Sequence, residues 1–380
     1  MSDAQDPKPD EKVTRRSVAG SWLWSAAVLG TGGAAGYALS RLRTTGPSRQ
    51  GPGPELGEAF TYDLSAIQKI DPALVRYREA AAFETGFRRA RGVAVAPDGR
   101  ILVAGDEAVR VFGPDGARQA EIAVGDRPRC VASAADGTIV AAMKDHVRVF
   151  DASGAPKATG ERLGDRAVIT SIAVVDDAVY IADSGNREVV RLDRAGAVKG
   201  RIGRKTPEKD VPGFVVPSPY FDLAIAADGQ LRVVNPGRHR VETYTTYGDY
   251  VRAWGEHSIQ VAGFIGCCNP AHMALTPEGD FITSEKGIPR IKRYAPDGRL
   301  LDVVAAPETL LAGQANAIDP ESGGTGAAFD VAVDAKGRVL ALDPFTRRVR
   351  IFVKKDCSDK PRRHGGHGDA FRFYVPEAPG

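Results

Sequence analysis

Two adjacent cysteines stand just before a histidine in the decapeptide GFIGCCNPAH, which covers residues 263–272. The cysteines are Cys267 and Cys268, and the histidine is His272. Thiolates and imidazole are ligands for zinc, copper and iron, while adjacent thiols also form a vicinal disulfide, whose strained ring favours a reversible switch. The decapeptide alone is therefore compatible with a metal site, a redox couple or a buried loop, and its place in the fold must decide.

The strands that would position this segment belong to a series of six similar sequence units. Each unit has two short alternating runs joined by a tight Asp-Gly-like turn, then a third run and a second glycine turn. The units begin at Gly92, Cys130, Ser171, Asp222, His272 and Asp330. Such units are typical of meandering antiparallel strands, and six of them predict an all-β, six-bladed β-propeller.

The third unit, SIAVVDDAVYIADSGNREVVRLDRAG (171–196), resembles the NHL-repeat family of β-propellers. Units of that family read small-apolar-Ala-Val, Asp-Gly, apolar-Ala-Asp and then Arg-apolar-x-apolar. The resemblance covers roughly Val75 to Val353. It implies the fold and is nearly silent about function. It also points to an axial metal, because amidating lyases with NHL-type propellers bind zinc through inward-facing residues of several blades.

The sixth unit is one strand short. It ends at VRIFV (349–353), whereas LVRYREAAAF (Leu74 to Phe83) precedes the first unit and has a β-forming pattern. We expect this earlier segment to supply the missing strand and close the ring, since closure removes exposed edge strands.

Aligning the units on their Asp-Gly turns places one residue of each unit in a ring around the axis. This first column contains Gly92, Cys130, Thr170 or Ser171, Asp222, His272 and Asp330. Cys130, Asp222, His272 and Asp330 are potential ligands for a transition metal such as zinc, copper or iron. The alternative is a ring of small polar residues that hydrogen-bond around the channel, with Cys130 as a small buried apolar residue.

The segment GEHSIQVAGFIGCCNPA (255–271) leads from the outer strand of one blade to the inner strand of the next, so it should lie at the channel mouth. A second column, at the end of the next strand, contains Gly105, Met143, Asp183, Asn235, Glu285 and Asp343. Short acids there favour capping of the following turn, although they could also face a ligand. The predicted ligand-binding residues are Cys267, Cys268, Asn269, Arg129 and Glu285; no catalytic residue is assigned.

Composition limits the classes of function. The 380 residues carry a formal net charge of +3, with scattered basic residues and no stacked aromatic platform, which argues against nucleic acid as a partner. Four cysteines are too few for a disulfide-stapled scaffold. The sequence lacks Gly-x-Ser-x-Gly, a phosphate-binding Gly-Lys-Ser/Thr loop and His-Glu-x-x-His.

The N-terminal region differs from the repeats. Residues 1–18 are polar and include a twin-arginine-like Thr14-Arg15-Arg16, and residues 19–40 form an uncharged stretch long enough to cross a bilayer. We expect a transmembrane anchor or uncleaved signal at 19–40, a linker at 41–70, the propeller at 71–355 and a polar tail at 356–380. Charge flanking the span favours an extracytoplasmic, periplasmic propeller. A Gly/Ala-rich cytoplasmic helix is the alternative.

These features lead to one expected function and two alternatives. The first is a membrane-anchored extracytoplasmic propeller that binds a ligand or a protein partner, as an accessory to a redox or metal-handling system. The second is a metal-dependent lyase or hydrolase with its site around His272. The third is a structural scaffold without a site.

Overall fold

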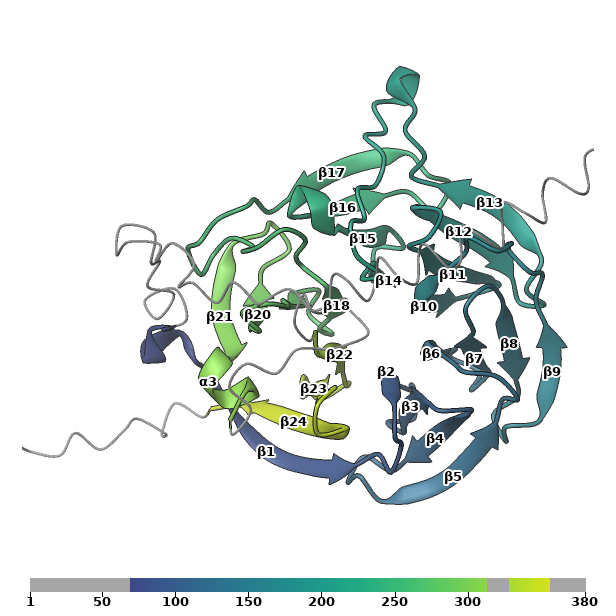
Figure 1. Cartoon of the computed structure of the whole chain (residues 1–380), viewed down its shortest axis with the longest axis horizontal. Helices are drawn as coiled ribbons and strands as arrows, with labels where there is room; N and C mark the ends of the chain where they lie inside the picture. Colours follow the sequence, from purple (N-terminus) through teal and green to yellow (C-terminus); the bar gives the residue numbers. More distant parts are fainter. Residues whose placement is uncertain (1–68, 313–327, 356–380) are drawn as a thin grey trace, which may run out of the picture. The chain divides into compact units, whose positions relative to one another are not determined.

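The structure is a computed structural model that describes residues 69–312 and 328–355. In these two ranges, 24 strands form six four-stranded antiparallel sheets, as the sequence predicts. Figure 1 shows one inner strand of each sheet facing the middle: β2, β6, β10, β14, β18 and β22. The predicted span at 19–40 and the polar tail at 356–380 lie outside the described residues, as does most of the linker.

Blades 1 to 3 each consist of four consecutive strands. They are β2 (Ala90–Val95), β3 (Ile101–Gly105), β4 (Ala108–Phe112) and β5 (Arg118–Ala123); β6 (Cys130–Ser133), β7 (Ile139–Ala142), β8 (Val147–Phe150) and β9 (Pro156–Thr159); and β10 (Ile169–Val175), β11 (Ala178–Asp183), β12 (Glu188–Asp193) and β13 (Val198–Ile202).

Blades 4 and 5 follow the same plan, and blade 6 takes its fourth strand from the N-terminal side. They are β14 (Leu223–Ile225), β15 (Leu231–Asn235), β16 (Arg240–Tyr244) and β17 (Tyr250–Trp254); β18 (His272–Leu275), β19 (Phe281–Ser284), β20 (Ile291–Tyr294) and β21 (Leu300–Ala305); and β22 (Asp330–Val333), β23 (Val339–Leu342), β24 (Arg348–Lys354) and β1 (Tyr77–Glu84). Short helices are η2 (Pro72–Leu74), η3 (Pro207–Lys209), η4 (Pro236–Arg238) and α3 (Pro307–Leu310).

Asp-Gly turns set the register between the first two strands of several blades. In blade 1 the Asp98 carboxylate accepts a hydrogen bond from the Arg100 N–H (3.0 Å), and Gly99 adopts a φ of 85°. Such a positive φ favours glycine, and the short aspartate satisfies a turn amide. The turn therefore fixes which side chains of the flanking strands face the same side of the sheet.

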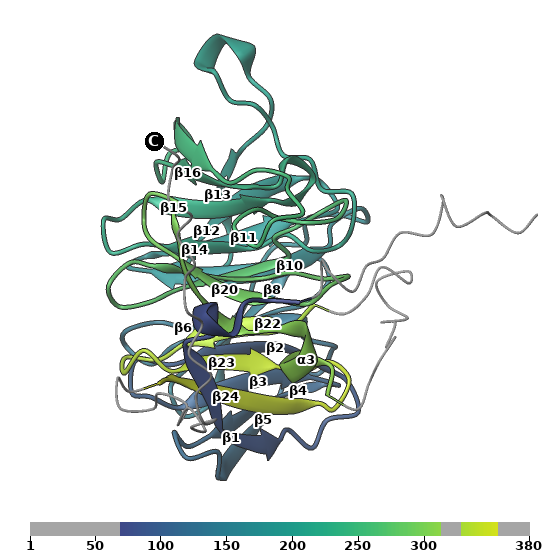
Figure 2. The same cartoon turned by 90° about the vertical axis from the view of Figure 1, so that its left-hand side faces the viewer.

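The β1 strand closes the ring by pairing with β24, as Figures 1 and 2 show. The pairing runs from Tyr77 opposite Lys354 to Glu84 opposite Arg348. The sequence predicted a closing strand at Leu74–Phe83; the observed strand begins later because Pro72–Leu74 forms the helix η2. The predicted closure is thus confirmed, with its start shifted.

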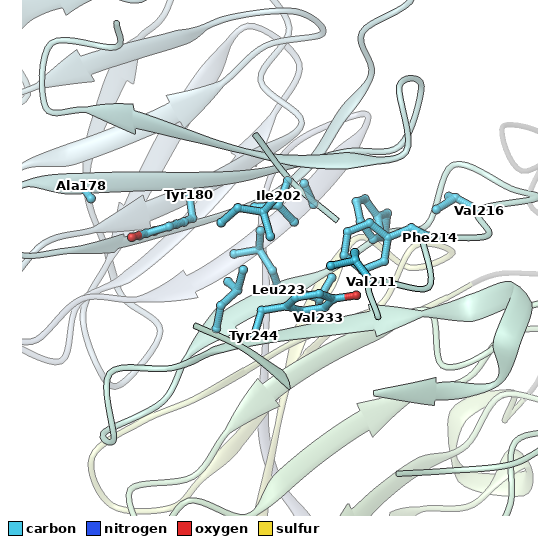
Figure 3. Close-up of a cluster of buried hydrophobic side chains, with 13 residues drawn as sticks. Ala178, Tyr180, Ile202, Val211, Phe214, Val216, Leu223, Val233 and Tyr244 are labelled. Carbon is cyan, nitrogen blue, oxygen red and sulfur yellow. The ribbon is translucent and has the colours of Figure 1, made fainter. Parts of the chain in front are cut away.

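Apolar side chains fill the spaces between neighbouring blades. Figure 3 shows the cluster between blades 3 and 4, where Tyr180 of β11, Phe214 and Tyr244 of β16 lie together. The ring of Phe214 lies 5.5 Å from that of Tyr244 in an edge-to-face arrangement, which suits two aromatic quadrupoles. The inner strands also contact one another in cyclic order, from β2 through β22 and back to β2. The apolar core is therefore distributed around the ring.

Within residues 69–312 and 328–355, none of the helices has the length and apolar character required to cross a bilayer.

Deleting Tyr77–Glu84 from the full chain should destabilise the whole ring, because β24 would lose its only partner on one side and expose an unpaired edge. Urea unfolding followed by circular dichroism measures the loss. Deleting residues 45–52, eight residues of the predicted linker, is the control and should leave the transition unchanged. Equal stability of the two deletion variants would show that β1 does not close the ring.

Candidate functional site

The first-column residues lie at equivalent positions of their blades. Five of them stand opposite the corresponding residue of the second strand: Gly92 opposite Ala104, Cys130 opposite Ala142, Ser171 opposite Ala182, His272 opposite Ser284 and Asp330 opposite Leu342. Asp222 directly precedes β14, and its carbonyl accepts a hydrogen bond from the Val234 N–H (3.0 Å). The alignment of the repeats therefore located a ring that exists in the fold.

Two carboxylates of this ring connect consecutive blades. The Asp222 carboxylate accepts a hydrogen bond from the Met273 N–H of blade 5 (2.9 Å). The Asp330 carboxylate accepts one from the Val93 N–H of blade 1 (2.7 Å). Each also accepts a bond from the next amide of its own chain. The two side chains thus have a structural role, whether or not they also bind a ligand.

Gly92 shows how closely the blades approach at the ring. A Cβ atom at this position would lie 2.9 Å from the Cys130 Cα and 3.0 Å from the Arg129 carbonyl oxygen. Any larger residue would push blade 2 away from blade 1. The first-column position of blade 1 therefore carries no functional side chain for a steric reason.

His272 lies between the two carboxylates. Its Nδ1 is 3.3 Å from Asp222 Oδ2 and 3.3 Å from Asp330 Oδ1. One potential ligand atom from each of these three residues lies within 4.8 Å of the other two. Three of the four predicted metal ligands therefore converge, and they come from blades 4, 5 and 6.

Charge and burial oppose each other at this cluster. Burial alone would lower the pKa of His272, but the neighbouring Asp330 and Asp222 carboxylates raise this pKa above its usual value. Burial raises the pKa of Asp330 to about 6, against the opposing effect of His272. His272 and Asp330 thus favour each other's charged forms, and a cation at this position would be favoured for the same reason.

Cys130 lies outside the convergent group. Its side chain is buried, and both burial and the nearby Asp330 raise the pKa of its thiol. Metals bind the thiolate rather than the thiol, so this environment is unfavourable for a sulfur ligand. The structure accordingly places Cys130 beside the cluster as a small buried side chain.

A cavity of about 790 Å³ opens beside the cluster. His272 and Asp330 line it together with Tyr220, and the positively charged lining residues are Arg88, Arg89, Arg91 and Arg129. The Arg129 Nε donates a hydrogen bond to the Ile169 carbonyl (3.0 Å), which holds this predicted site residue at the cavity wall. Four of the lining residues are thus arginines, a composition that favours an anionic ligand.

The two cysteines of the decapeptide lie side by side, with their Sγ atoms 3.0 Å apart. Cys267 is exposed, whereas Cys268 is 1% exposed and accepts a hydrogen bond from the Ser218 hydroxyl (3.3 Å). Burial raises the pKa of Cys268, but hydrogen bonds from Cys267, Lys286 and Ser218 lower it below its usual value. Donation to Cys268 raises the pKa of Cys267.

Asn269 and Glu285 hold the cysteine-bearing connection instead of facing the cavity. The Asn269 side chain, 1% exposed, donates to the Ile265 and Lys286 carbonyls and accepts from the Lys286 N–H. The Glu285 carboxylate is fully buried; it accepts from the Ile265 N–H and pairs with Arg290 and Lys292. These two predicted ligand-binding residues lack the exposure needed to contact a ligand.

Glu285 shares this role with other residues of the second column. Asp183 accepts a hydrogen bond from the Val168 N–H (2.9 Å), and Asn235 accepts one from the Val215 N–H (2.9 Å). Both amides belong to the connection that enters the same blade. Asp343 caps its following turn, and Asp183 also accepts from the Gly185 and Asn186 N–H groups of its own turn. The capping interpretation is thus confirmed for these two aspartates, whereas Asn235 and Glu285 attach the connections that surround the cavity.

Sequence reasoning missed the residues that approach the site from connections of irregular length. Ser218 and Tyr220 lie between β13 and β14, and the Tyr220 ring packs edge-on against His272 with centroids 5.5 Å apart. Lys286 follows the second-column Glu285, and its Nζ lies 5.3 Å from the Tyr220 ring. The repeat pattern marks Lys286 only by its position next to a column residue and gives no signal for the other two.

The comparisons with known proteins support the fold alone. No family model matches the chain, and no curated protein matches it. Among solved structures, a streptogramin B lyase is 11% identical, with a TM-score of 0.50, covering 75% of this chain and all of that one. Selenomethionine-substituted virginiamycin B lyase from Staphylococcus aureus is 10% identical, with a TM-score of 0.50, covering 73% and 99%.

A protein of unknown function from Bacteroides thetaiotaomicron VPI-5482 is 17% identical, with a TM-score of 0.49, covering 73% of this chain and 72% of that one. At these identities the likeness carries no information about activity, and it leaves the NHL resemblance as an inference from the repeats. The chain is an all-β, six-bladed propeller, an architecture that it shares with the two lyase structures.

Replacing Asp330 by alanine should lower the free energy of unfolding by about 1–3 kcal/mol, because the buried Val93 N–H loses its acceptor. Asp330→Asn should cost less, since the amide oxygen can still accept. Asp297→Ala is a matched control, because Asp297 also accepts a backbone N–H, but at an exposed turn where water can take the place of the carboxylate. Urea denaturation measures all three, and equal effects of D330A and D297A would contradict the inter-blade role.

Proposed function

We propose that the chain is a ligand-binding propeller whose axial cavity holds a divalent transition metal through Asp222, His272 and Asp330, and takes a small anionic ligand. The function is that of a binding module, an accessory to a metal-handling or redox system. The metal site rests on the convergence of one imidazole and two carboxylates. The ligand class rests on the cationic lining of the adjoining cavity.

The convergence of one donor atom from each of Asp222, His272 and Asp330 supports the metal assignment. A charge-assisted hydrogen bond between imidazolium and carboxylate is usually about 2.7–2.9 Å long. Around a tetrahedral metal with bonds of about 2.0–2.2 Å, ligand atoms lie roughly 3.3–3.6 Å apart. His272 Nδ1 lies 3.3 Å from both carboxylates, a spacing that is compatible with a shared metal and that also allows a hydrogen bond to Asp222 Oδ2. Nitrogen and carboxylate donors suit zinc or iron better than copper(I).

The arginines would complement the metal in binding an anion. A ligand in this cavity would meet His272 and Asp330 together with lining arginines such as Arg129. Carboxylates and phosphates are the anions that guanidinium groups bind in two-point geometry. A cavity of about 790 Å³ has the size of a small-molecule site.

A lyase or hydrolase remains the second candidate. The observation that favours it is that His272, flanked by two carboxylates, lines the cavity and could accept a proton from a bound substrate. The structurally similar streptogramin and virginiamycin B lyases share only the fold at 10–11% identity, so their activities provide no support.

The purified chain should bind one equivalent of zinc or ferrous iron, as measured by elemental analysis and calorimetric titration of the metal alone. His272→Ala should abolish binding, and Asp222→Asn or Asp330→Asn should weaken it at least tenfold, a size of effect typical of altered metal sites (about 10–100-fold). His257→Ala is the matched control, since His257 is an exposed histidine outside the convergent group. Unchanged affinity in the His272 variant would exclude the metal centre proposed here.

The location of the propeller is also a proposal. An uncharged segment at 19–40 would anchor the chain in a membrane, with the propeller on the extracytoplasmic side and a protein partner within reach of the cavity face. The sequence supplies the support for this arrangement.

Removing residues 1–45 should release the protein from the membrane fraction and yield a soluble, folded propeller, because no other stretch approaches about 18 uncharged apolar residues. Fractionation of cells, followed by thermal melting of the released protein, tests this. Removing residues 1–13, which leaves the span intact, is the control and should keep the protein in the membrane. A truncated protein that stays membrane-bound would reveal a second membrane contact.

A further inference from the structure

The connection that carries Cys267 and Cys268 is held firmly at both sides of the pair. Upstream, the Ile265 N–H donates to the Glu285 carboxylate (3.0 Å), and downstream, the Asn269 side chain is bonded to the Lys286 backbone. The contacts use charged or amide groups that are buried. The two sulfur atoms are thus held 3.0 Å apart by the surrounding chain.

This spacing suits sulfur–sulfur bond formation better than shared metal coordination. Two thiolates bound to one zinc ion at about 2.3 Å lie roughly 3.7 Å apart, whereas a disulfide bond is about 2.05 Å long. Within the described residues, the convergent group of potential metal ligands contains neither cysteine. The pair therefore lacks the further ligands that a metal site needs.

The two thiols differ in their access to solvent. Cys267 is exposed, so it can meet a reactant, whereas Cys268 is buried and only 1% exposed. Ser218 donates to the Cys268 Sγ, and the buried Lys286 also lowers the pKa of this thiol. The surroundings stabilise negative charge on the inner sulfur.

We propose that Cys267 and Cys268 form a dithiol–disulfide couple that exchanges electrons with small thiols and disulfides, with Cys267 as the exchanging sulfur and Cys268 as the resolving sulfur. The couple is a second site, and it does not require the metal centre.

In the oxidising direction, the Cys267 thiolate attacks a small disulfide RSSR, forms a mixed disulfide and releases one RS⁻. The Cys268 thiolate then attacks the Cys267 sulfur, closes the vicinal disulfide and releases the second RS⁻. Two electrons pass from the protein to RSSR, and the two protons of the cysteines end on the released thiols at a pH below their pKa. Reduction by two RSH molecules is the reverse.

The electrostatics agree with this division of roles in the reducing direction. A sulfur with a lower pKa leaves faster from a disulfide, and the hydrogen bonds to Cys268 lower its pKa. When an external thiolate attacks the exposed Cys267, the departing Cys268 thiolate is received by Ser218 and Lys286. The external thiolate thus attacks the exposed sulfur of Cys267, and the buried sulfur of Cys268 carries the negative charge after the bond breaks.

The test uses the full chain with Cys357 replaced by serine, so that Cys130 is the only other thiol. Reduced protein is incubated with oxidised glutathione, and its intact mass is measured. The parent should lose two hydrogens without retaining an adduct. Cys268→Ser should keep one glutathione on Cys267, whereas Cys267→Ser should gain none in the same time.

Two outcomes would overturn the proposal: a glutathione adduct on Cys268 in the Cys267→Ser variant, or a parent pair that stays reduced while the same pair oxidises after unfolding in urea. Cys130 reports on folding in every sample, because this buried thiol should react only when the protein unfolds. If Cys268→Ser exposes Cys130, the variant Cys268→Ala replaces it.

Ser218→Ala separates the resolving role from simple proximity. Loss of the hydroxyl removes one donor to Cys268 and should slow reduction of the vicinal disulfide by glutathione roughly two- to fivefold, with the thiolate absorbance appearing at a higher pH. Ser153→Ala is the control, since that hydroxyl bonds only within an exposed turn. An unchanged pH profile in S218A would contradict the assignment of Cys268 as the stabilised thiolate.

Discussion

The innermost strand of each blade pairs with only one neighbour in its own sheet, and the rest of the structure depends on how the other edge is satisfied. Blade 5 presents the Met273 N–H towards blade 4, and blade 1 presents the Val93 N–H towards blade 6. Carboxylates of the preceding blade accept both hydrogen bonds. A buried amide without a partner would cost about as much as several apolar contacts contribute, so these carboxylates are part of the scaffold.

The same constraint produces the candidate site. Because backbone amides fix Asp222 and Asp330, both carboxylates are already oriented when they meet His272 from the blade between them. This arrangement would favour the binding of a ligand, because the two side chains are already ordered and lose little conformational entropy on binding. Stability and the proposed metal binding would therefore depend on the same two residues, and a variant at either position should affect both.

A second set of side chains attaches the connections to the ring. Glu285 is an example: its carboxylate lies in a buried group with Arg290 and Lys292, and it also accepts the Ile265 N–H near the cysteine pair. Burial lowers the pKa of Lys292 to about 8, with partial compensation from Glu285. Charges buried in this way are tolerated only when they are paired, and the pairing keeps the connection in one conformation.

Side-chain contacts link the cysteine pair to the cavity. Lys286 interacts with Cys268, and its Nζ lies 5.3 Å from the Tyr220 ring. Tyr220 in turn contacts His272 and lines the cavity. One lysine and one aromatic ring therefore separate the sulfur atoms from the axial cluster. Tyr220 and Cys268 are far apart in the sequence, so their proximity in the fold cannot be predicted from the sequence.

The sequence by itself determined the number of blades, the meander within each blade, the closing strand and the first-column ring. These follow from local pattern, because turn chemistry and strand periodicity recur in every unit and equal positions in a repeat become equal positions in space. The same regularity identified Asp222, His272 and Asp330 as neighbours. It did not separate Cys130, which occupies the ring without joining the convergent group.

Only the tertiary structure decided what the irregular parts do. It placed Asn269 and Glu285 in buried hydrogen-bond networks, brought Ser218 to Cys268, and lined the cavity with arginines. These contacts depend on connections of unequal length folding back onto the ring, and no period in the sequence encodes where such a connection ends. Repeats fix the frame because their geometry is local, while side chains from the connections acquire their partners only after the ring has closed.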